Sequence, residues 1–298
     1  MKNSVLLYIF IFSVSISNGQ SDSNEKEIVT QTYAQSWDLD SIGKKRSFKI
    51  SSYKFNYLTP ARITNHVNTK PQSENPIYST TEAVDYDNIE VKFQLSFKAK
   101  LIQSIFKGKG DIWLGYTQIA HIQSYNVELS RPIREIDFEP ELIFKYPIKV
   151  QLLGGHLNSV GIAYNHQSNG KDFPLSRSWN RIIFDTTYEN NNWIISIRPW
   201  IRLSEGDEID SDENPAITDY IGNGELNISY TYKRHLFYTN ITHPFTHLYG
   251  GSIQLNYIFP ITALLCGQVQ FFNGYGETLI DYNFNQTTIG VGVSLANW

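Results

Sequence analysis

The stretch Val91-Lys92-Phe93-Gln94-Leu95-Ser96-Phe97-Lys98 decides the fold, because apolar and polar residues alternate along all of it. Successive side chains of a β-strand point to opposite faces, so this stretch forms a strand with one apolar and one polar face. Residues 193–202 and 289–296 repeat the same period of two. A water-soluble β-sandwich also alternates in this way, and it is the alternative fold that the pattern leaves open. In either case the pattern predicts an all-β protein.

Twelve segments of this kind follow one another along the chain, and their connectors indicate a membrane barrel. The segments lie near residues 47–57, 90–101, 110–121, 135–145, 158–168, 177–188, 192–203, 219–231, 234–244, 249–258, 262–272 and 284–296. Long connectors such as 58–89 and 122–134 alternate with tight ones such as 189–191 and 232–233, which is typical of external loops and periplasmic turns. We therefore expect a twelve-stranded antiparallel transmembrane β-barrel, a multi-pass protein of the bacterial cell outer membrane.

The composition excludes several other classes of protein. The chain has 298 residues, of which 41% are hydrophobic and 14% aromatic, and its formal net charge is −4. This charge argues against a nucleic-acid binder, which needs a basic surface. A single Cys rules out an internal disulfide framework. No uninterrupted apolar stretch reaches the roughly 18 to 20 residues of a membrane-spanning helix, which excludes a helical membrane protein but not a barrel.

The chain divides into three parts. Residues 1–20 combine Lys2 with a short apolar region and small residues at the end, the pattern of a secretory signal peptide that is cleaved near Gly19 or Gln20. Residues 21–46 are polar and charged, and we expect them to form an N-terminal periplasmic segment. The barrel is then expected to occupy residues 47–298, and its hairpin 158–188 carries the most informative motif.

Three polar residues of this hairpin are predicted to share the outer face of the barrel. His166 and Ser168 are two residues apart on the face that also carries Ile162, and after an Asn-Gly turn Asn180 shares its face with Ile182. Polar residues on a lipid-facing wall are costly unless they are used. Ser, His and a third group that orients the imidazole are the parts of an activated nucleophile. From the pattern alone, a catalytic triad and surface decoration both remain open.

Two motifs make the chain recognisable, namely His166-Gln167-Ser168-Asn169-Gly170 and Ser176-Arg177-Ser178-Trp179-Asn180-Arg181. They resemble the outer membrane phospholipase A family, the calcium-dependent, dimer-activated barrels of Gram-negative bacteria. The resemblance implies hydrolysis of the acyl esters of phospholipids and lysophospholipids by a phospholipase A1/A2. In that case Ser168 is the nucleophile, His166 the general base and Asn180 the residue that orients His166. The Gly170 amide is the expected oxyanion donor.

The resemblance also implies bound Ca²⁺ and a homodimer. The matching calcium ligands are the Ser130 hydroxyl, the Lys171 backbone carbonyl and the Ser176 hydroxyl, with Glu213 as a further acid. All four offer oxygen, as calcium requires, and the family ion bridges two barrels. Gln118 matches a position at the dimer interface and has the parity of an outward-facing residue, although a glutamine in the lumen is the alternative.

A non-enzymatic outer-membrane barrel, either a porin or an adhesin scaffold, is the alternative function. The side chains predicted to point inward include several cations that suit the lining of a channel, namely Lys92, Lys98, Arg198 and Arg202. In a barrel of this size, however, such side chains are expected to pair with acids and fill the lumen.

Overall fold

The structure is a computed structural model that describes most of the chain. The described residues are 32–39, 47–204, 212–245, 249–262 and 264–295. The predicted signal peptide, residues 1–20, lies outside the described residues. Neither α-helix in the described part has the length and apolar character needed to cross a lipid bilayer.

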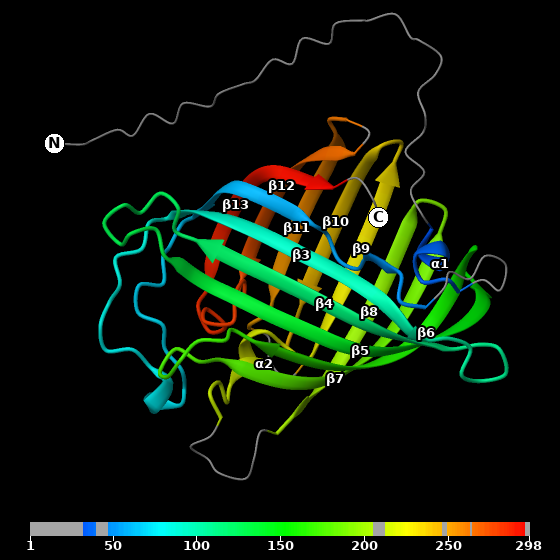
Figure 1. The fold of residues 1–298 in the computed structure, drawn as a ribbon, viewed down its shortest axis with the longest axis horizontal. Coiled ribbons are helices and arrows are strands. Elements are labelled where there is room, and N and C mark those ends of the chain that lie inside the picture. The colour runs from blue at the N-terminus through cyan, green and yellow to red at the C-terminus, as the bar shows by residue number, and fades with distance from the viewer. Residues whose placement is uncertain (1–31, 40–46, 205–211, 246–248, 263, 296–298) are drawn as a thin grey trace, which may run out of the picture.

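Short helices and long strands make up the fold (Figure 1). The helices are α1 (Tyr33–Ser36), the 3-10 helix η1 (Pro76–Tyr78) and α2 (Ile217–Tyr220). The strands are β1 (Ile50–Ser52), β2 (Tyr57–Thr64), β3 (Ile89–Ile102), β4 (Asp111–Ile122), β5 (Ile133–Leu152), β6 (Gly155–Ser168), β7 (Ser178–Asn190), β8 (Trp193–Leu203), β9 (Gly224–Tyr232), β10 (His235–Thr242), β11 (Ser252–Pro260), β12 (Leu265–Gly274) and β13 (Gln286–Leu295).

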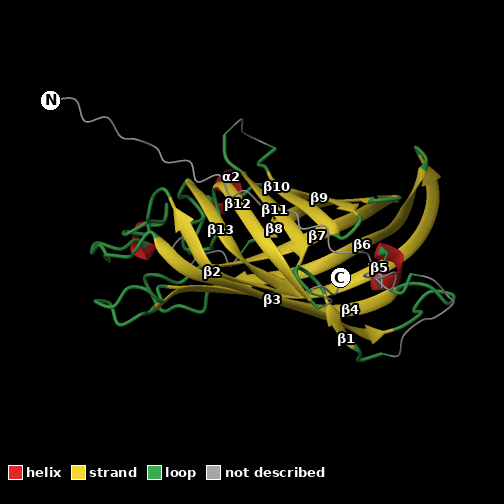
Figure 2. Ribbon diagram, turned by 90° about the horizontal axis from the view of Figure 1, so that it is seen from above, coloured by secondary structure: helices red, strands yellow, loops and turns green. Residues whose placement is uncertain are grey.

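The strands close into a barrel. From β2 to β13 each strand pairs antiparallel with the next, and β13 pairs with β2, so the ring has twelve strands. The short β1 pairs with β3 beyond the end of β2. Figure 2 shows the tilted strands surrounding one interior. The predicted all-β, twelve-stranded antiparallel barrel is therefore confirmed.

The first strand does not lie where the sequence predicted it. Within the segment 47–57 only β1 is a regular strand, and it is three residues long. The main first strand, β2, lies almost entirely within residues 58–89, which were predicted to be a loop.

Two local features explain this error. Between β1 and β2, the Asn56 side chain donates to Ser96 O over 3.1 Å and accepts from Ser96 N over 2.6 Å. These side-chain bonds take the place of the backbone hydrogen bonds that a continuous strand would make with β3. Within β2, Pro60 has no N–H to donate, and the register with β3 shifts between Thr59 and Arg62. The break and the bulge both interrupt the period of two.

Other strand boundaries are also corrected. The hairpin of β5 and β6 was predicted to have a connector between 145 and 158, but its strands extend to a turn at 153–154. Leu153 and Gly154 both have positive φ, as a tight two-residue hairpin turn requires. The segment 219–231 begins too early, because the chain forms α2 before β9 starts at Gly224.

The two faces of the barrel wall have opposite polarity. On β3, Leu95 is 48% exposed, whereas Lys92, Ser96 and Lys98 are buried inside. A sandwich in water would present its polar face outward, so this arrangement is that of a barrel in lipid. Near the end of the barrel with tight turns, aromatic rings of β8 to β11 contact one another on the outer wall, as in the interfacial girdle of membrane barrels.

Lys92, Arg198 and Arg202 are paired with acids, as predicted, whereas Lys98 donates to Ser36 Oγ over 2.8 Å and lies 4.0 Å from the Trp37 ring centroid. Lys92 Nζ lies 3.0 Å from a Glu277 oxygen. Arg198 contacts Glu141 and Glu225, each over 2.7 Å. The charge on these side chains is thus already neutralised, so they do not support a channel that selects ions by an exposed cationic lining.

The end of the barrel with tight turns is filled by the described part of the N-terminal segment, residues 32–39. Trp37 is buried there, and its ring lies 5.3 Å from that of Trp113 and 5.7 Å from that of Tyr53. Asp38 forms an ion pair with Lys100 over 3.0 Å. This part of the N-terminal segment therefore packs inside the barrel.

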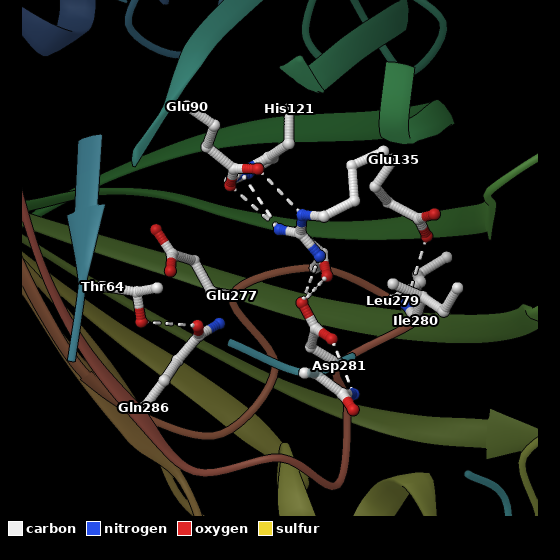
Figure 3. A network of polar contacts seen from close by, with 12 residues as sticks. Thr64, Glu90, His121, Glu135, Glu277, Leu279, Ile280, Asp281 and Gln286 are labelled. Carbon is white, nitrogen blue, oxygen red and sulfur yellow. Dashed lines mark hydrogen bonds and ion pairs between the residues drawn. The ribbon is translucent and has the colours of Figure 1, made fainter. Parts of the chain in front are cut away.

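At the other end, the loop between β12 and β13 folds into the lumen (Figure 3). Asp281 pairs with Arg134 over 2.7 Å, and the backbone N–H of Ile280 donates to Glu135 over 3.1 Å. Glu277 of the same loop pairs with Arg62. Burial by itself would raise the pKa of Glu277, but Arg62 and Lys92 hold that pKa well below its usual range. The loop is thus held to the wall by charge.

Candidate active site

His166, Ser168 and Asn180 lie on the outer wall, where β6 and β7 pair. Their register sets His166 opposite Asn180 and Ser168 opposite Ser178. All three candidate side chains are half-buried. Same-face neighbours such as Ile162 are exposed, whereas the alternate residues are buried in the lumen. The period of two along β6 and β7 therefore presents the three polar groups to the outside of the barrel.

His166 and Asn180 are joined by a hydrogen bond. His166 Nδ1 lies 2.9 Å from Asn180 Oδ1. An amide oxygen only accepts, so Nδ1 carries the proton and Nε2 of the neutral ring has the free lone pair. Ser168 lies two residues further along the same face, and no hydrogen bond joins its hydroxyl to His166 in the described part of the chain. The arrangement therefore brings a candidate base together with a candidate group that sets its tautomer, next to a candidate nucleophile on the same face.

The turn after Ser168 is held by two buried residues, Asn169 and Arg177. Asn169 N donates to Arg177 O over 3.0 Å, and Arg177 N donates to Asn169 Oδ1 over 2.9 Å. The Asn169 amide also donates to Glu135 Oε1 over 3.0 Å, which ties the turn to the lumen. Burial lowers the pKa of Arg177, whose guanidinium donates to four backbone carbonyls. These bonds fix the backbone next to Ser168.

Gly170 occupies a position that favours glycine. Its φ is +60°, in the left-handed region, and a Cβ at this residue would lie 3.1 Å from the ring of Phe138. The sequence thus allows the chain to turn sharply directly after Ser168 and Asn169, beside the candidate nucleophile.

The inner side of the hairpin is rigid. Trp179 is fully buried and its indole N–H donates to Gln167 Oε1 over 2.9 Å. The Arg181 guanidinium lies 4.0 Å from the Trp179 ring centroid and also bonds Asn165. The residues that alternate with the polar outer groups therefore pack firmly in the lumen and support them.

Two of the predicted calcium ligands contact each other. The Ser176 hydroxyl donates to Glu213 Oε1, and Glu213 Oε2 is buried without a hydrogen-bond partner in the described part of the chain. A hydroxyl beside a carboxylate with an unused oxygen suits a hard cation such as calcium. No group of three or more His, Cys, Asp or Glu side chains forms a metal site among the described residues. The donors fit calcium but are too few to surround it.

The other predicted ligands lie in loops at the same end of the barrel, but no hydrogen bond links them to Ser176 or Glu213 in the described part of the chain. Ser130 is exposed in the loop between β4 and β5, with a φ of +60°. Lys171 follows the Asn-Gly turn, and its Nζ lies 3.8 Å from Glu135. Since β4 and β6 run in the same direction, both loops lie at the same end of the barrel.

Gln118 has the parity of the outer wall, with Leu114 exposed on the same face and Thr117 buried. Its side-chain oxygen accepts from the Tyr116 hydroxyl over 3.0 Å. Gln118 pairs with Phe138 of β5, and Phe138 in turn pairs with Ser168 of β6. Gln118 and Ser168 are thus two strands apart, about 10 Å, on one continuous face.

The sequence did not reveal all the residues that shape this site. Tyr164 was not among the candidate residues of the sequence analysis, yet its hydroxyl donates to Asn180 Oδ1 over 2.8 Å. Tyr164 is two residues before His166 and therefore on the same face, and this spacing could have identified it from the sequence. Asn169 and Arg177 stood inside the recognised motifs, but their reciprocal bonds across the turn depend on the folded loop.

The comparisons with known proteins agree with the fold and the motifs. The Phospholipase A1 family matches residues 33–295. The chain is 36% identical over 248 residues to the phospholipase A1 of Escherichia coli strain K12, covering 83% of this chain and 82% of that protein. It is also 36% identical over 264 residues to a putative phospholipase A1 of Neisseria meningitidis serogroup B, covering 86% of this chain and 68% of the relative.

Two solved structures are similar in three dimensions. The outer membrane phospholipase A of Escherichia coli superposes with a TM-score of 0.74 at 35% identity, covering 83% of this chain and 94% of that one. The outer membrane phospholipase of Salmonella typhi, solved as a dimer with bound calcium, has a TM-score of 0.76 at 33% identity and covers 86% and 95% of the two chains.

Proposed function

The chain belongs to the phospholipase A1 family, and from this premise we propose how its outer wall carries out hydrolysis. The protein is an enzyme of the bacterial outer membrane that cleaves phospholipid esters. In our proposal Ser168 is the nucleophile, His166 the general base and then acid, and Asn180 the residue that orients His166. The 2.9 Å hydrogen bond between His166 and Asn180 on the lipid-facing wall is the observation that carries the proposal.

The proposed reaction has two steps. Ser168 Oγ attacks the ester carbonyl carbon while His166 Nε2 takes its proton. The bond to the glycerol oxygen breaks, His166 returns the proton to that oxygen, and a lysophospholipid leaves. Water, deprotonated by His166, then attacks the carbonyl carbon of the acyl-serine. The bond to Ser168 Oγ breaks, His166 returns the proton to that oxygen, and the fatty acid leaves. Asn180 keeps the proton on Nδ1 throughout, so that Nε2 stays available. Lysophospholipids present the same ester and are proposed as substrates too.

Gly170 and calcium are proposed to stabilise the oxyanion of each step. The Gly170 amide is the protein donor, held beside Ser168 by the bonds of Asn169 and Arg177. Ser176 and Glu213 would hold the ion together with the Lys171 carbonyl and Ser130. When bound, Ca²⁺ supplies positive charge where negative charge develops. The unused, buried oxygen of Glu213 supports this assignment.

A homodimer is proposed as the active form. Ser130 belongs to a different loop from the triad, and a single chain offers too few oxygens for the six to eight that calcium takes. A second barrel facing the first would supply Ser130 to its partner's site. Gln118 is proposed to lie at this interface, since it shares the outer face with Ser168. The calcium-bound dimer of the Salmonella typhi relative supports the same arrangement.

Substrate is proposed to arrive sideways through the membrane. The triad lies outside the barrel, at the loop end, which we assign to the extracellular side. The outer leaflet there is normally lipopolysaccharide, so activity is expected to stay low until phospholipid enters that leaflet and two barrels meet.

The decisive experiment measures fatty-acid release from phospholipid in mixed micelles. We expect release with calcium, little release with a chelator, and none from Ser168→Ala in either condition. Release that continues in Ser168→Ala would overturn the nucleophile assignment. Release that a chelator leaves unchanged would overturn the calcium assignment and leave the triad intact.

A further inference from the structure

The Asn180 side-chain oxygen accepts a hydrogen bond from a member of the proposed triad and another from a residue outside it. His166 Nδ1 lies 2.9 Å from Asn180 Oδ1, and the Tyr164 hydroxyl donates to the same oxygen over 2.8 Å. Tyr164 is opposite Ile182 in the register, so it reaches Asn180 diagonally across the β6–β7 pair. The Tyr164 phenol therefore contacts Asn180, which is proposed to orient the base. In the described part of the chain, no side-chain hydrogen bond joins Tyr164 to His166 or Ser168.

A neutral amide needs such a second contact. A carboxylate presents oxygen to the imidazole whichever way it turns, whereas an amide turned by 180° presents its NH₂ group. An NH₂ group donates to Nδ1, which moves the ring proton to Nε2 and leaves no base beside Ser168. An Asn in the third position therefore requires something that keeps its oxygen toward His166.

We propose that Tyr164 is a positioning residue, whose hydroxyl holds the Asn180 amide with its oxygen toward His166. Phenol is a better hydrogen-bond donor than acceptor, so its contact with Asn180 favours the oxygen over the NH₂ group. Tyr164 is 46% exposed on a wall that faces lipid, where few waters are present to replace a lost donor. The inference rests on the proposed triad. It adds Tyr164 as the residue that allows an uncharged Asn to serve as the third member.

The test is a double-mutant cycle measured by fatty-acid release in mixed micelles with calcium. Tyr164→Phe keeps the ring on the lipid-facing wall and removes only the hydroxyl. We expect kcat to fall about threefold to tenfold, the range for one neutral hydrogen bond, with KM unchanged. In an Asn180→Asp background the same substitution should leave kcat unchanged, because a carboxylate needs no orientation. It should also change nothing in Asn180→Ala, which has no amide to turn.

Tyr188→Phe is the matched control. Tyr188 lies on the same face of β7 and its hydroxyl donates to Leu153 O over 3.1 Å, far from the triad along the strand. It should retain wild-type kcat. Tyr164→Phe with wild-type kcat, with a raised KM instead of a lowered kcat, or with an equal loss in the Asn180 backgrounds would overturn the inference. If both backgrounds are too slow to measure, the split between kcat and KM in the single variant decides. Ser168→Ala, run in parallel, tests the triad itself, so a failure of the proposed function is distinguishable from a failure of the role of Tyr164.

Discussion

The barrel interior and the outer wall of the β6–β7 hairpin both hold polar groups away from bulk water, but they satisfy them differently. Inside, Arg62 contacts Glu90 over 3.0 Å and also pairs with Glu277, and Glu90 accepts from Arg134 over 2.8 Å. Figure 3 shows Glu90 and Glu277 together with Asp281 of the β12–β13 loop. On the outer wall, the His166 ring makes one hydrogen bond in the described part of the chain, which it donates to the short side chain of Asn180.

This difference separates groups that hold the fold from groups that are proposed to carry out the chemistry. A buried charge with several partners is stable only while all of them remain, so the interior charges are coupled to folding. The outer residues are neutral and half-buried, so the fold depends on them little, and His166 retains a nitrogen for proton transfer. We therefore expect interior variants to lose stability and outer-wall variants to lose activity.

The largest expected effect comes from the outer wall. Ser168→Ala should lower the rate of phospholipid hydrolysis by at least about 10⁴-fold, because the nucleophile is absent. A small substitution at a half-buried rim position should change the free energy of unfolding by no more than about 0.5 kcal/mol. The heat-modifiable band of the folded barrel on gels should therefore be unchanged. A variant that loses both the band and the activity would break the separation of the two regions.

The next effect comes from the interior. Arg62→Ala leaves Glu277 and Glu90 short of a partner and should lower the free energy of unfolding by about 3 to 5 kcal/mol. Urea unfolding in lipid vesicles, followed by tryptophan fluorescence, measures it. The matched control, Arg62→Lys, should lose less, because it keeps a cation beside Glu277 and Glu90. Activity per folded barrel should stay close to wild type, and a large loss of that activity would mean that the interior also tunes the site.

A smaller effect distinguishes two members of the outer wall. Asn180→Ala should slow hydrolysis about tenfold to a hundredfold, the value of one hydrogen bond to a group that becomes charged. His166→Ala should be slower still, because it removes the base itself. Both variants are compared at matched amounts of folded barrel. A greater loss in Asn180→Ala than in His166→Ala would show that the two roles are wrongly assigned.

The smallest effect should come from a loop outside both regions. Ser130→Ala removes one of the six to eight calcium oxygens and should weaken calcium affinity by about tenfold or less. Because the ion is proposed to join two barrels, dimerisation must weaken by the same factor. Analytical ultracentrifugation in detergent, with calcium titrated in, compares the variant with wild type. If the monomer–dimer equilibrium of the wild type does not change with calcium concentration, the proposed coupling is wrong, whatever the variant does.

Much of the fold could be predicted from the sequence, because strand parity is a local property. The alternation in residues 91–98 was sufficient to assign an apolar and a polar face, and the same count placed Lys92 and Arg198 inside. The strand boundaries failed where the local pattern was interrupted, at Pro60 in β2 and at the bulge after Pro147 in β5. Proline removes a backbone donor, and a bulge shifts the count by one residue, so a period of two is lost at both places.

The sequence by itself determined that His166, Ser168 and Asn180 share one face, because spacing along two strands joined by a short turn is enough to fix parity. Only the tertiary structure decided what surrounds that face. The bond from Tyr164 to Asn180 depends on the register between strands, and the hydrogen bond from Asn169 to Glu135 joins β5 to the turn after Ser168. The burial of Trp37 against Trp113 joins segments that are far apart in the chain. Contacts across such distances arise when the barrel closes, since closure, and no local period, brings those residues together.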